Sequence, residues 1–291
     1  MIIGLIRTMR PKQWTKNLFV FAALVFDRKL TNPVLFAKTL VAFILLCLVS
    51  STVYLINDLV DIEKDRQHPN KRLRPLPSGQ LKPVVAIVAA ILIPAISLPL
   101  AFFLNLYFGL IVTVYLLVMI AYSFWLKNVV IVDVLTIAAG FVLRVAAGIP
   151  MVHVVRFSPW LYVCTTLLAL FIGFGKRRHE LSLLQANANN HRAVLNDYNL
   201  IFLDEMIGVV TASTVMAYSL YTFSAEGLPP NHAMMLTIPF VLYGIFRYLY
   251  LIHVRNEGGT PEEIILRDRS LLADVLLWGL SVIVILYFFK P

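Results

Sequence analysis

Long apolar segments constrain this chain more than any other feature. Hydrophobic residues make up 59% of its 291 residues and charged residues only 14%, and its mean hydropathy is +0.81. Too few polar residues remain to cover a water-soluble surface. The apolar runs are continuous and of helix length, whereas a transmembrane barrel would alternate over segments of about ten residues. We therefore predict an all-α, polytopic membrane protein with a single transmembrane helical domain over residues 1–291.

The hydropathy pattern predicts about nine membrane spans. Their expected ranges are 17–26, 35–60, 84–103, 106–125, 129–149, 159–174, 205–223, 234–252 and 271–289. Most lysines and arginines between these spans fall on the side of the N-terminus, and the opposite side receives only Arg28, Lys29, Lys38, Arg156 and Lys290.

Basic residues accumulate in the cytoplasmic loops of membrane proteins. The unequal distribution therefore predicts a multi-pass protein of the cell (inner) membrane, with its N-terminus and its long loops in the cytoplasm. The formal net charge of +9 then reflects this topology and anionic ligands in the bilayer or the cytoplasm. We expect no nucleic-acid partner, and the sequence leaves a homo-oligomer open.

An acidic cluster ends the second span and comprises Asn57, Asp58, Asp61 and Asp65. On a helix Asn57, Asp61 and Asp65 recur every four residues and share one face. Oxygen ligands of this kind suit Mg²⁺, which one or two carboxylates hold and which substrate phosphates share. The alternative is a solvated acidic helix end, and the basic loop that follows favours the metal site.

Four basic segments accompany this cluster, at residues 10–17, 70–79, 122–127 and 173–180. Lysine and arginine near metal-binding carboxylates fit a polyanion that bridges both. For each segment the alternative is a plain positive loop that only sets the topology, or, around Trp14, an anchor at the membrane interface.

Arg144 lies inside the fifth expected span, among small residues that permit close helix packing. A guanidinium at this depth in lipid is costly and is a functional candidate by default. The structural alternative is an ion pair with Asp133.

The run from Asn57 to Asp65 resembles the first Asp-rich motif of the UbiA-type intramembrane prenyltransferases, and residues 74–79 and 122–127 are also similar to that superfamily. Its members usually carry a second Asp-rich motif after the sixth span. This chain has three cations and one carboxylate there, at residues 176–180. Together with residues 10–17, this departure resembles the decaprenyl-phosphate phosphoribosyltransferase branch.

The resemblance implies a Mg²⁺-dependent transferase that moves 5-phosphoribosyl from phosphoribosyl pyrophosphate to a polyprenyl phosphate and releases pyrophosphate. The two substrates bring a pyrophosphate, a 5-phosphate and a lipid phosphate, which would occupy several basic segments. The expected metal ligands are Asn57 and Asp61, and the expected catalytic residues are Asp58, Asp61 and Asp65. The expected contacts of phosphoribosyl pyrophosphate are Lys16, Tyr54, Lys71, Lys127 and Arg144, and those of the lipid phosphate are Lys176, Arg177 and Arg178.

Two other functions stay open at this point. A prenyltransferase that acts on an aromatic acceptor, such as a quinone precursor, should carry a second carboxylate pair, for which Asp204 and Glu205 lack the usual spacing. A transporter or lipid-binding protein should spread its charges through the bilayer midplane or break its helices in paired halves. The charges here gather at one interface, which favours an enzyme.

Overall fold

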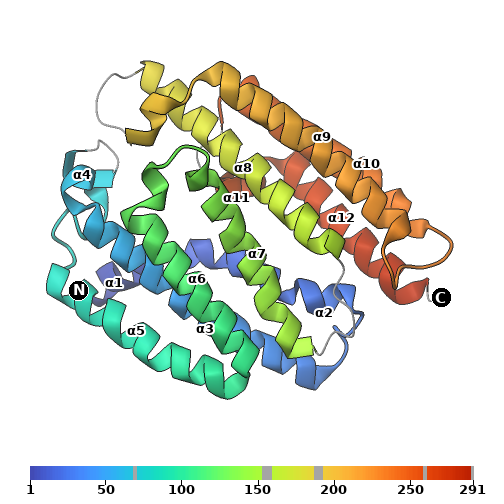
Figure 1. Cartoon of the computed structure of the whole chain (residues 1–291), viewed down its shortest axis with the longest axis horizontal. Helices are drawn as coiled ribbons and strands as arrows, with labels where there is room; N and C mark the ends of the chain where they lie inside the picture. The colour runs from blue at the N-terminus through green and yellow to red at the C-terminus, as the bar shows by residue number, and fades with distance from the viewer. Residues whose placement is uncertain (68–70, 153–158, 187–192, 258–260, 290–291) are drawn as a thin grey trace. The chain divides into compact units, whose positions relative to one another are not determined.

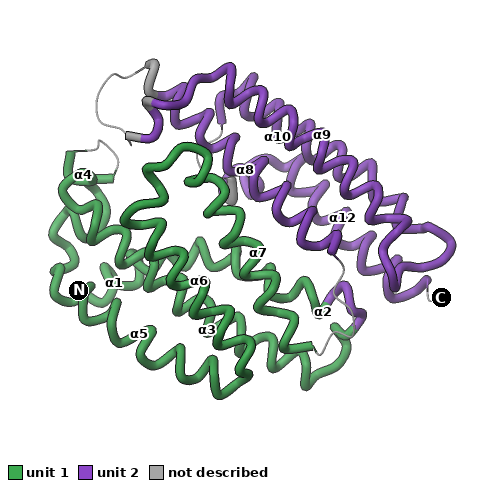
Figure 2. Tube along the Cα trace, viewed as in Figure 1, with its two compact units in different colours: residues 1–24, 29–155 green, residues 25–28, 156–291 purple. Residues whose placement is uncertain are grey.

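The computed structural model describes residues 1–67, 71–152, 159–186, 193–257 and 261–289, so Arg156 and Lys290 lie outside the described residues. Within these ranges the regular structure is entirely helical (Figure 1). The chain divides into two compact units (Figure 2), the first formed by residues 1–24 and 29–155 and the second by residues 25–28 and 156–291. The expectation of one domain stays a prediction.

The described residues contain eight helices that are long and apolar enough to cross a membrane. Up to residue 155 the elements are α1 (Ile2–Met9), η1 (Pro11–Phe21), α2 (Ala22–Phe26), α3 (Pro33–Val60), α4 (Ile62–Gln67), η2 (Lys71–Leu73), α5 (Pro83–Leu104), α6 (Leu106–Phe124), η3 (Leu126–Asn128) and α7 (Val132–Val152). From residue 156 they are α8 (Pro159–Ala186), η4 (Ala193–Asp197), α9 (Leu200–Ser224), η5 (Ala233–Thr237), α10 (Ile238–His253), α11 (Pro261–Arg267) and α12 (Arg269–Phe288).

The eight long helices overlap the second to ninth expected spans. The first expected span, 17–26, forms the end of the 3₁₀ helix η1 and the short helix α2. This segment is not among the eight helices of the described residues that are long and apolar enough to cross a membrane.

In the first unit α3 is the central helix and packs against η1, α5, α6 and α7. Its start is fixed by Asn32, whose side chain accepts hydrogen bonds from two backbone N–H groups of the first turn, and by Pro33 at the first helical position. The 3₁₀ helix η1 crosses α7 so closely that a Cβ atom on Gly148 would lie 2.0 Å from the carbonyl oxygen of Val20. The small residues of α7 therefore do permit the close packing that the sequence predicts.

In the second unit α8 packs against α9, and α10 packs against both α9 and α12. The indole of Trp278 donates a hydrogen bond to the hydroxyl of Tyr218, which joins α12 to α9. Helix α8 continues twelve residues beyond the expected end of its span at residue 174. It can do so because its charged residues find partners, among them Arg177 and Glu180 one turn apart on the same helix.

Candidate active site

The acidic cluster lies at the end of α3 in the first unit, where the helix does not run straight through it. Helix α3 ends at Val60, and Asp61 caps it before the short helix α4 begins. The expected single helical face is therefore interrupted at Asp61. The turn is still tight, because the N–H of Asp61 bonds the carbonyl of Asn57 at 3.0 Å and the N–H of Asp65 bonds that of Asp61 at 2.8 Å.

Two of the three carboxylates are buried and tied to arginines. Asp58 is 1% exposed and accepts hydrogen bonds from Arg10 and, at 3.3 Å, from Arg74. Asp65 is 3% exposed and accepts a bond of 2.6 Å from the same nitrogen of Arg74. Arg10 also lies 5.0 Å above the ring of Tyr54. This network joins the end of α3, α4, the loop at residues 74–81 and the segment between α1 and η1.

Asp61 differs from the other two carboxylates in exposure and in partner. Its side chain is 16% exposed, against 2% for that of Asp58 and 4% for that of Asp65. Lys127, which is itself buried, donates to both of its oxygens at 2.7 and 2.9 Å. In the part of the chain that the structure describes, the side chain of Asn57 forms no hydrogen bond, so its amide oxygen remains available beside Asp61.

Arg144 belongs to the same unit, is buried and has no carboxylate partner among the described residues. It donates to the side-chain oxygen of Asn17 at 2.9 Å and to the hydroxyl of Tyr115 at 2.7 Å, and its guanidinium lies 4.8 Å from the Tyr115 ring centre. The alternative ion pair with Asp133 does not form. The amide of Asn17 in turn donates to Ser50 on α3 at 3.1 Å, and Ser50 precedes Asp58 by about two turns, or roughly 12 Å.

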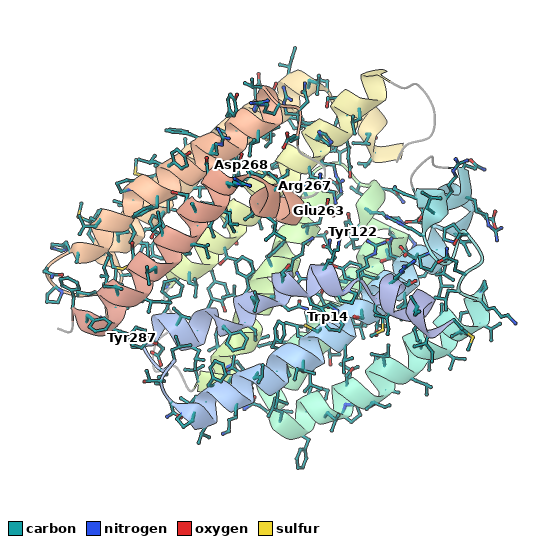
Figure 3. All side chains as sticks on the ribbon, turned by 180° about the vertical axis from the view of Figure 1, so that it is seen from behind. Trp14, Tyr122, Glu263, Arg267, Asp268 and Tyr287 are labelled. Atoms are coloured by element: carbon teal, nitrogen blue, oxygen red, sulfur yellow. The ribbon has the colours of Figure 1, made fainter. Side chains whose placement is uncertain are left out.

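The remaining expected contacts of the sugar donor also belong to the first unit. Lys16 lies on η1 and is partly buried, near Trp14, whose indole donates to the hydroxyl of Ser51 on α3 at 3.0 Å (Figure 3). Lys71 begins η2. The first unit thus brings together Asp58, Asp61 and Asp65 with Tyr54 and Lys127, and it places Arg144 beside Asn17 of η1.

The expected lipid-phosphate residues belong to the second unit, on α8, and carboxylates already hold two of them. Arg177 is 1% exposed and pairs with Glu180 at 2.6 Å. Arg178 pairs with Asp204 on α9 at 2.5 Å, and the same carboxylate lies 3.1 Å from His253 on α10. Lys176 is partly buried. The run lies within α8, which continues to Ala186.

Sequence reasoning missed the partners of these groups. Arg10 and Arg74 received no role, although each directly precedes a proline within a basic segment. Asn17 and Tyr115 were also missed, and no local pattern marks them. The one available signal was Arg144 itself, because a guanidinium inside a span requires polar neighbours.

The comparisons with known proteins bear on this geometry. Residues 17–264 match the model of the UbiA prenyltransferase family. The chain belongs to that family. The members of this family are transferases, and eight helices in the described residues are long and apolar enough to cross a membrane. This UbiA protein is therefore a transferase and a multi-pass membrane protein.

Curated relatives match over nearly the full length. The chain is 32% identical to decaprenyl-phosphate phosphoribosyltransferase of Mycolicibacterium smegmatis, over 99% of this chain and 94% of the relative. It is 31% identical to the protein of that name from Mycobacterium tuberculosis, over 96% of this chain and 92% of the relative. Among solved structures, a UbiA homologue from Archaeoglobus fulgidus bound to GPP and Mg²⁺ shares the fold with a TM-score of 0.73 at 21% identity, over 96% of this chain and 99% of that one.

Proposed function

We propose that this UbiA protein transfers a 5-phosphoribosyl group from phosphoribosyl pyrophosphate to a polyprenyl phosphate of the decaprenyl type and releases pyrophosphate. The observation that carries the proposal is the near full-length similarity, at about 31% identity, to enzymes named for that transfer. The residues support it, because the first unit combines oxygen ligands for a cation with several cations that suit phosphates.

Asn57 and Asp61 fit the requirements of a Mg²⁺ site. Asp61 is the most exposed carboxylate of the cluster, and the amide of Asn57, one turn before it, is unengaged in the described residues. Two protein oxygens are sufficient, because Mg²⁺ keeps several waters and shares substrate phosphates. When bound, the metal would neutralise the charge that develops on the leaving pyrophosphate.

Asp58 and Asp65 would act on the site through the arginines that they hold. Both carboxylates are buried and already paired, so their role is to fix Arg10 and Arg74 at the edge of the cluster. The side chain of Arg10 is 27% exposed and that of Arg74 is 30% exposed. Fixed guanidiniums of this kind suit phosphate oxygens because they donate several hydrogen bonds in a rigid plane.

Lys127 and Arg144 would position the donor, together with Lys16, Tyr54 and Lys71. Lys127 donates to both oxygens of Asp61, so a cation that binds this carboxylate would release the ammonium to a donor phosphate. Arg144 is a buried positive charge without a carboxylate, which suits an anion that enters the unit from the polar end of α3.

The acceptor would be held by Lys176, Arg177 and Arg178, with Arg178 exchanging Asp204 for the lipid phosphate. One phosphate oxygen then forms a bond to the anomeric carbon while the bond from that carbon to pyrophosphate breaks, and pyrophosphate leaves with the electron pair. A phosphate monoester is already anionic at neutral pH, so no strong general base is required. The rate enhancement would come from positioning and electrostatics, with the reaction on the cytoplasmic side.

The test uses the purified full chain in lipid nanodiscs with labelled phosphoribosyl pyrophosphate, Mg²⁺ and decaprenyl phosphate. We expect a labelled lipid and free pyrophosphate in equal amounts, both dependent on Mg²⁺. Arg178→Ala should raise the KM for the lipid phosphate more than the KM for the sugar donor. Absence of labelled lipid, or equal effects of Arg178→Ala on both substrates, would contradict the proposal or its division of roles.

Prenyl transfer to an aromatic acceptor is the second candidate, because the family name and the GPP-bound neighbour point to that chemistry for other members. Asp204, the carboxylate that would have to serve a second metal, is instead engaged by Arg178 and lies beside His253. A polyprenyl diphosphate with an aromatic acid in the same nanodiscs tests it, and prenylated product would favour this candidate.

A further inference from the structure

A polar cavity of about 550 Å³ lies in the second unit, and no residue that lines it belongs to the proposed active site. Its walls come from the end of α8, the end of α10, the short helix α11 and the residue that caps α12. Its volume lies within the range of about 300–1,000 Å³ that is typical of small-molecule sites. The charged and titratable side chains around it are His179, Arg247, Arg255, Glu257, Glu263, Arg267 and Asp268.

The chain after α10 is shaped to present residues to this cavity. The N–H of Glu257 bonds the carbonyl of Leu251 at 2.9 Å, and the N–H of Arg255 bonds that of Tyr250 at 3.3 Å. Asn256 between them adopts a left-handed conformation with φ of 54°, which asparagine tolerates better than most residues. This turn places Arg255 and Asn256 in the cavity wall.

The three arginines that line the cavity differ in the ion pairs and hydrogen bonds that their guanidiniums already form. Arg247 is fixed, because it donates two hydrogen bonds to Asp268, at 3.2 and 2.7 Å. Arg267 is loosely held, since its side chain is 79% exposed and lies 3.5 Å from Glu263 (Figure 3). Arg255 forms no ion pair or hydrogen bond through its side chain in the described residues, and its guanidinium only lies 5.9 Å from the ring of Tyr250. Two positive charges therefore remain available to a ligand.

His179 adds a buried polar atom that lacks a partner. Its Nδ1 atom is buried and has no hydrogen-bond partner in the described residues. A ligand with both hydroxyl groups and phosphate oxygens can satisfy Nδ1 in either tautomer, because it offers donors as well as acceptors.

The net charge of the residues that line the cavity indicates which kind of anion it can bind. The three arginines face the three carboxylates of Glu257, Glu263 and Asp268, so the cavity as a whole is close to neutral. A free polyphosphate would meet these carboxylates without compensation. A phosphate monoester instead matches the two available guanidiniums, and hydroxyl groups on the same molecule can donate to Glu257 and Glu263.

We propose that this cavity binds a phosphate monoester on a polyhydroxylated ring, a sugar phosphate or the phosphorylated headgroup of a lipid, through Arg255, Arg267 and His179. The inference goes beyond the proposed transfer reaction, because it concerns a binding site made of other residues. Arg255 and Arg267 would hold the phosphate, His179 would meet a hydroxyl or phosphate oxygen, and Arg247 with Asp268 would form the rigid wall.

The test measures binding to the full chain in phosphatidylcholine nanodiscs by calorimetry, in an Asp61→Ala background that removes the proposed metal ligand of the active site. Ribose 5-phosphate, ribose and inorganic phosphate are the soluble probes. Nanodiscs that contain phosphatidylinositol 4-phosphate present the phosphorylated headgroup of a lipid. The test variants are the single substitution Arg255→Gln and its combination with Arg267→Gln. Both positions are exposed, so folding should persist. Arg269→Gln is the matched control, because Arg269 is exposed, close in sequence and absent from the cavity wall.

We expect ribose 5-phosphate or the phosphoinositide to bind, and the tighter of the two identifies the source. The double substitution should weaken binding at least about tenfold, the effect of losing a charged hydrogen bond, while Arg269→Gln leaves it unchanged. Binding that is unaffected by the double substitution, or equally tight binding of inorganic phosphate, would overturn the proposal. So would a tenfold rise in the KM for phosphoribosyl pyrophosphate in the double variant with Asp61 intact, since the cavity would then be part of the donor site.

Discussion

The acidic cluster at the end of α3 and the basic run within α8 differ in where their oppositely charged partners come from. At the end of α3 three carboxylates take their cations from segments remote in sequence, with Arg10 and Lys127 separated from their partners by 48 and 66 positions. Within α8 the cations pair with carboxylates nearer in sequence, Arg177 with Glu180 three residues on and Arg178 with Asp204 twenty-six residues on. The first arrangement ties several segments into one network, whereas the second joins Arg177 to its own helix and Arg178 to an aspartate that also lies 3.1 Å from His253.

This difference indicates where function and stability coincide. A carboxylate at the end of α3 cannot change without releasing a cation that belongs to another segment. Loss of a carboxylate near α8 releases a cation of the same helix or of an adjacent helix. Substitutions at the first end should therefore affect both activity and folding, and those at the second end should affect one at a time.

The largest effect is expected for Asp61→Ala. Loss of a metal ligand should lower phosphoribosyl transfer by about a hundredfold or more, which corresponds to the several kcal/mol that a metal contributes to charge stabilisation. The measurement is Mg²⁺-dependent turnover in nanodiscs. Glu63→Ala is the matched control, because Glu63 is two residues away, its side chain is 74% exposed and its one ion pair in the described residues is with Arg66. Equal losses in the two variants would remove Asp61 from the mechanism.

A second test compares Asp58→Asn with Glu180→Gln. Asp58 is buried and shared by Arg10 and Arg74, so its loss should lower the free energy of unfolding by about 3 kcal/mol or more. Glu180 pairs with an arginine of its own helix and its side chain is 28% exposed, so the effect should be about 1 kcal/mol or less. Unfolding curves in the same detergent measure both. Similar losses would show that the network is no more cooperative than a pair.

Arg144→Met separates a role in binding from a role in folding. Replacing a buried guanidinium that has no carboxylate by an apolar side chain should change the free energy of unfolding by about 1 kcal/mol or less. The KM for phosphoribosyl pyrophosphate should rise about tenfold, the effect of losing a charged hydrogen bond. Tyr115→Phe, which keeps the ring beneath the guanidinium, is the companion variant and should have a smaller effect on KM. Marked destabilisation with an unchanged KM would make Arg144 structural.

The smallest effect is expected for Asp268→Asn, and it depends on pH. Hydrogen bonds from Arg247 hold the pKa of the Asp268 carboxyl below its ordinary value. The pair therefore stabilises the fold above that ordinary value of about 3.9, and this contribution disappears as the pH falls through the lower pKa of the folded protein. Asparagine caps helices as well as aspartate does, so the substitution isolates the ion pair.

Thermal unfolding followed from pH 7 downward measures this prediction. The wild type should melt above Asp268→Asn at pH 7, and the two melting temperatures should converge in acid. A difference that persists after the carboxyl is protonated would assign it to the cap of α12 instead.

The two regions also show which features of the fold and of the candidate site can be predicted from the sequence. Apolar length predicts α3 and the other long helices because hydropathy is a local property, and the acidic cluster is visible because its members lie within nine residues. The partners of that cluster are not visible, since they come from the segment before η1, from η3 and from the loop after η2. Arg144 illustrates this, because its oxygen acceptor Asn17 lies 127 positions away. The extension of α8 past residue 174 was missed for the same reason, since its charges are neutralised partly by another helix.

The most direct test of the central claim is to locate a cation in the full chain with the sugar donor. We suggest soaking Mn²⁺, which has a strong anomalous signal and the same preference for oxygen ligands, into crystals grown with a non-reactive analogue of phosphoribosyl pyrophosphate. We expect an anomalous peak within bonding distance of the side-chain oxygens of Asn57 and Asp61, with Lys127 turned from Asp61 to a phosphate. A peak elsewhere, with Lys127 still bound to Asp61, would contradict it.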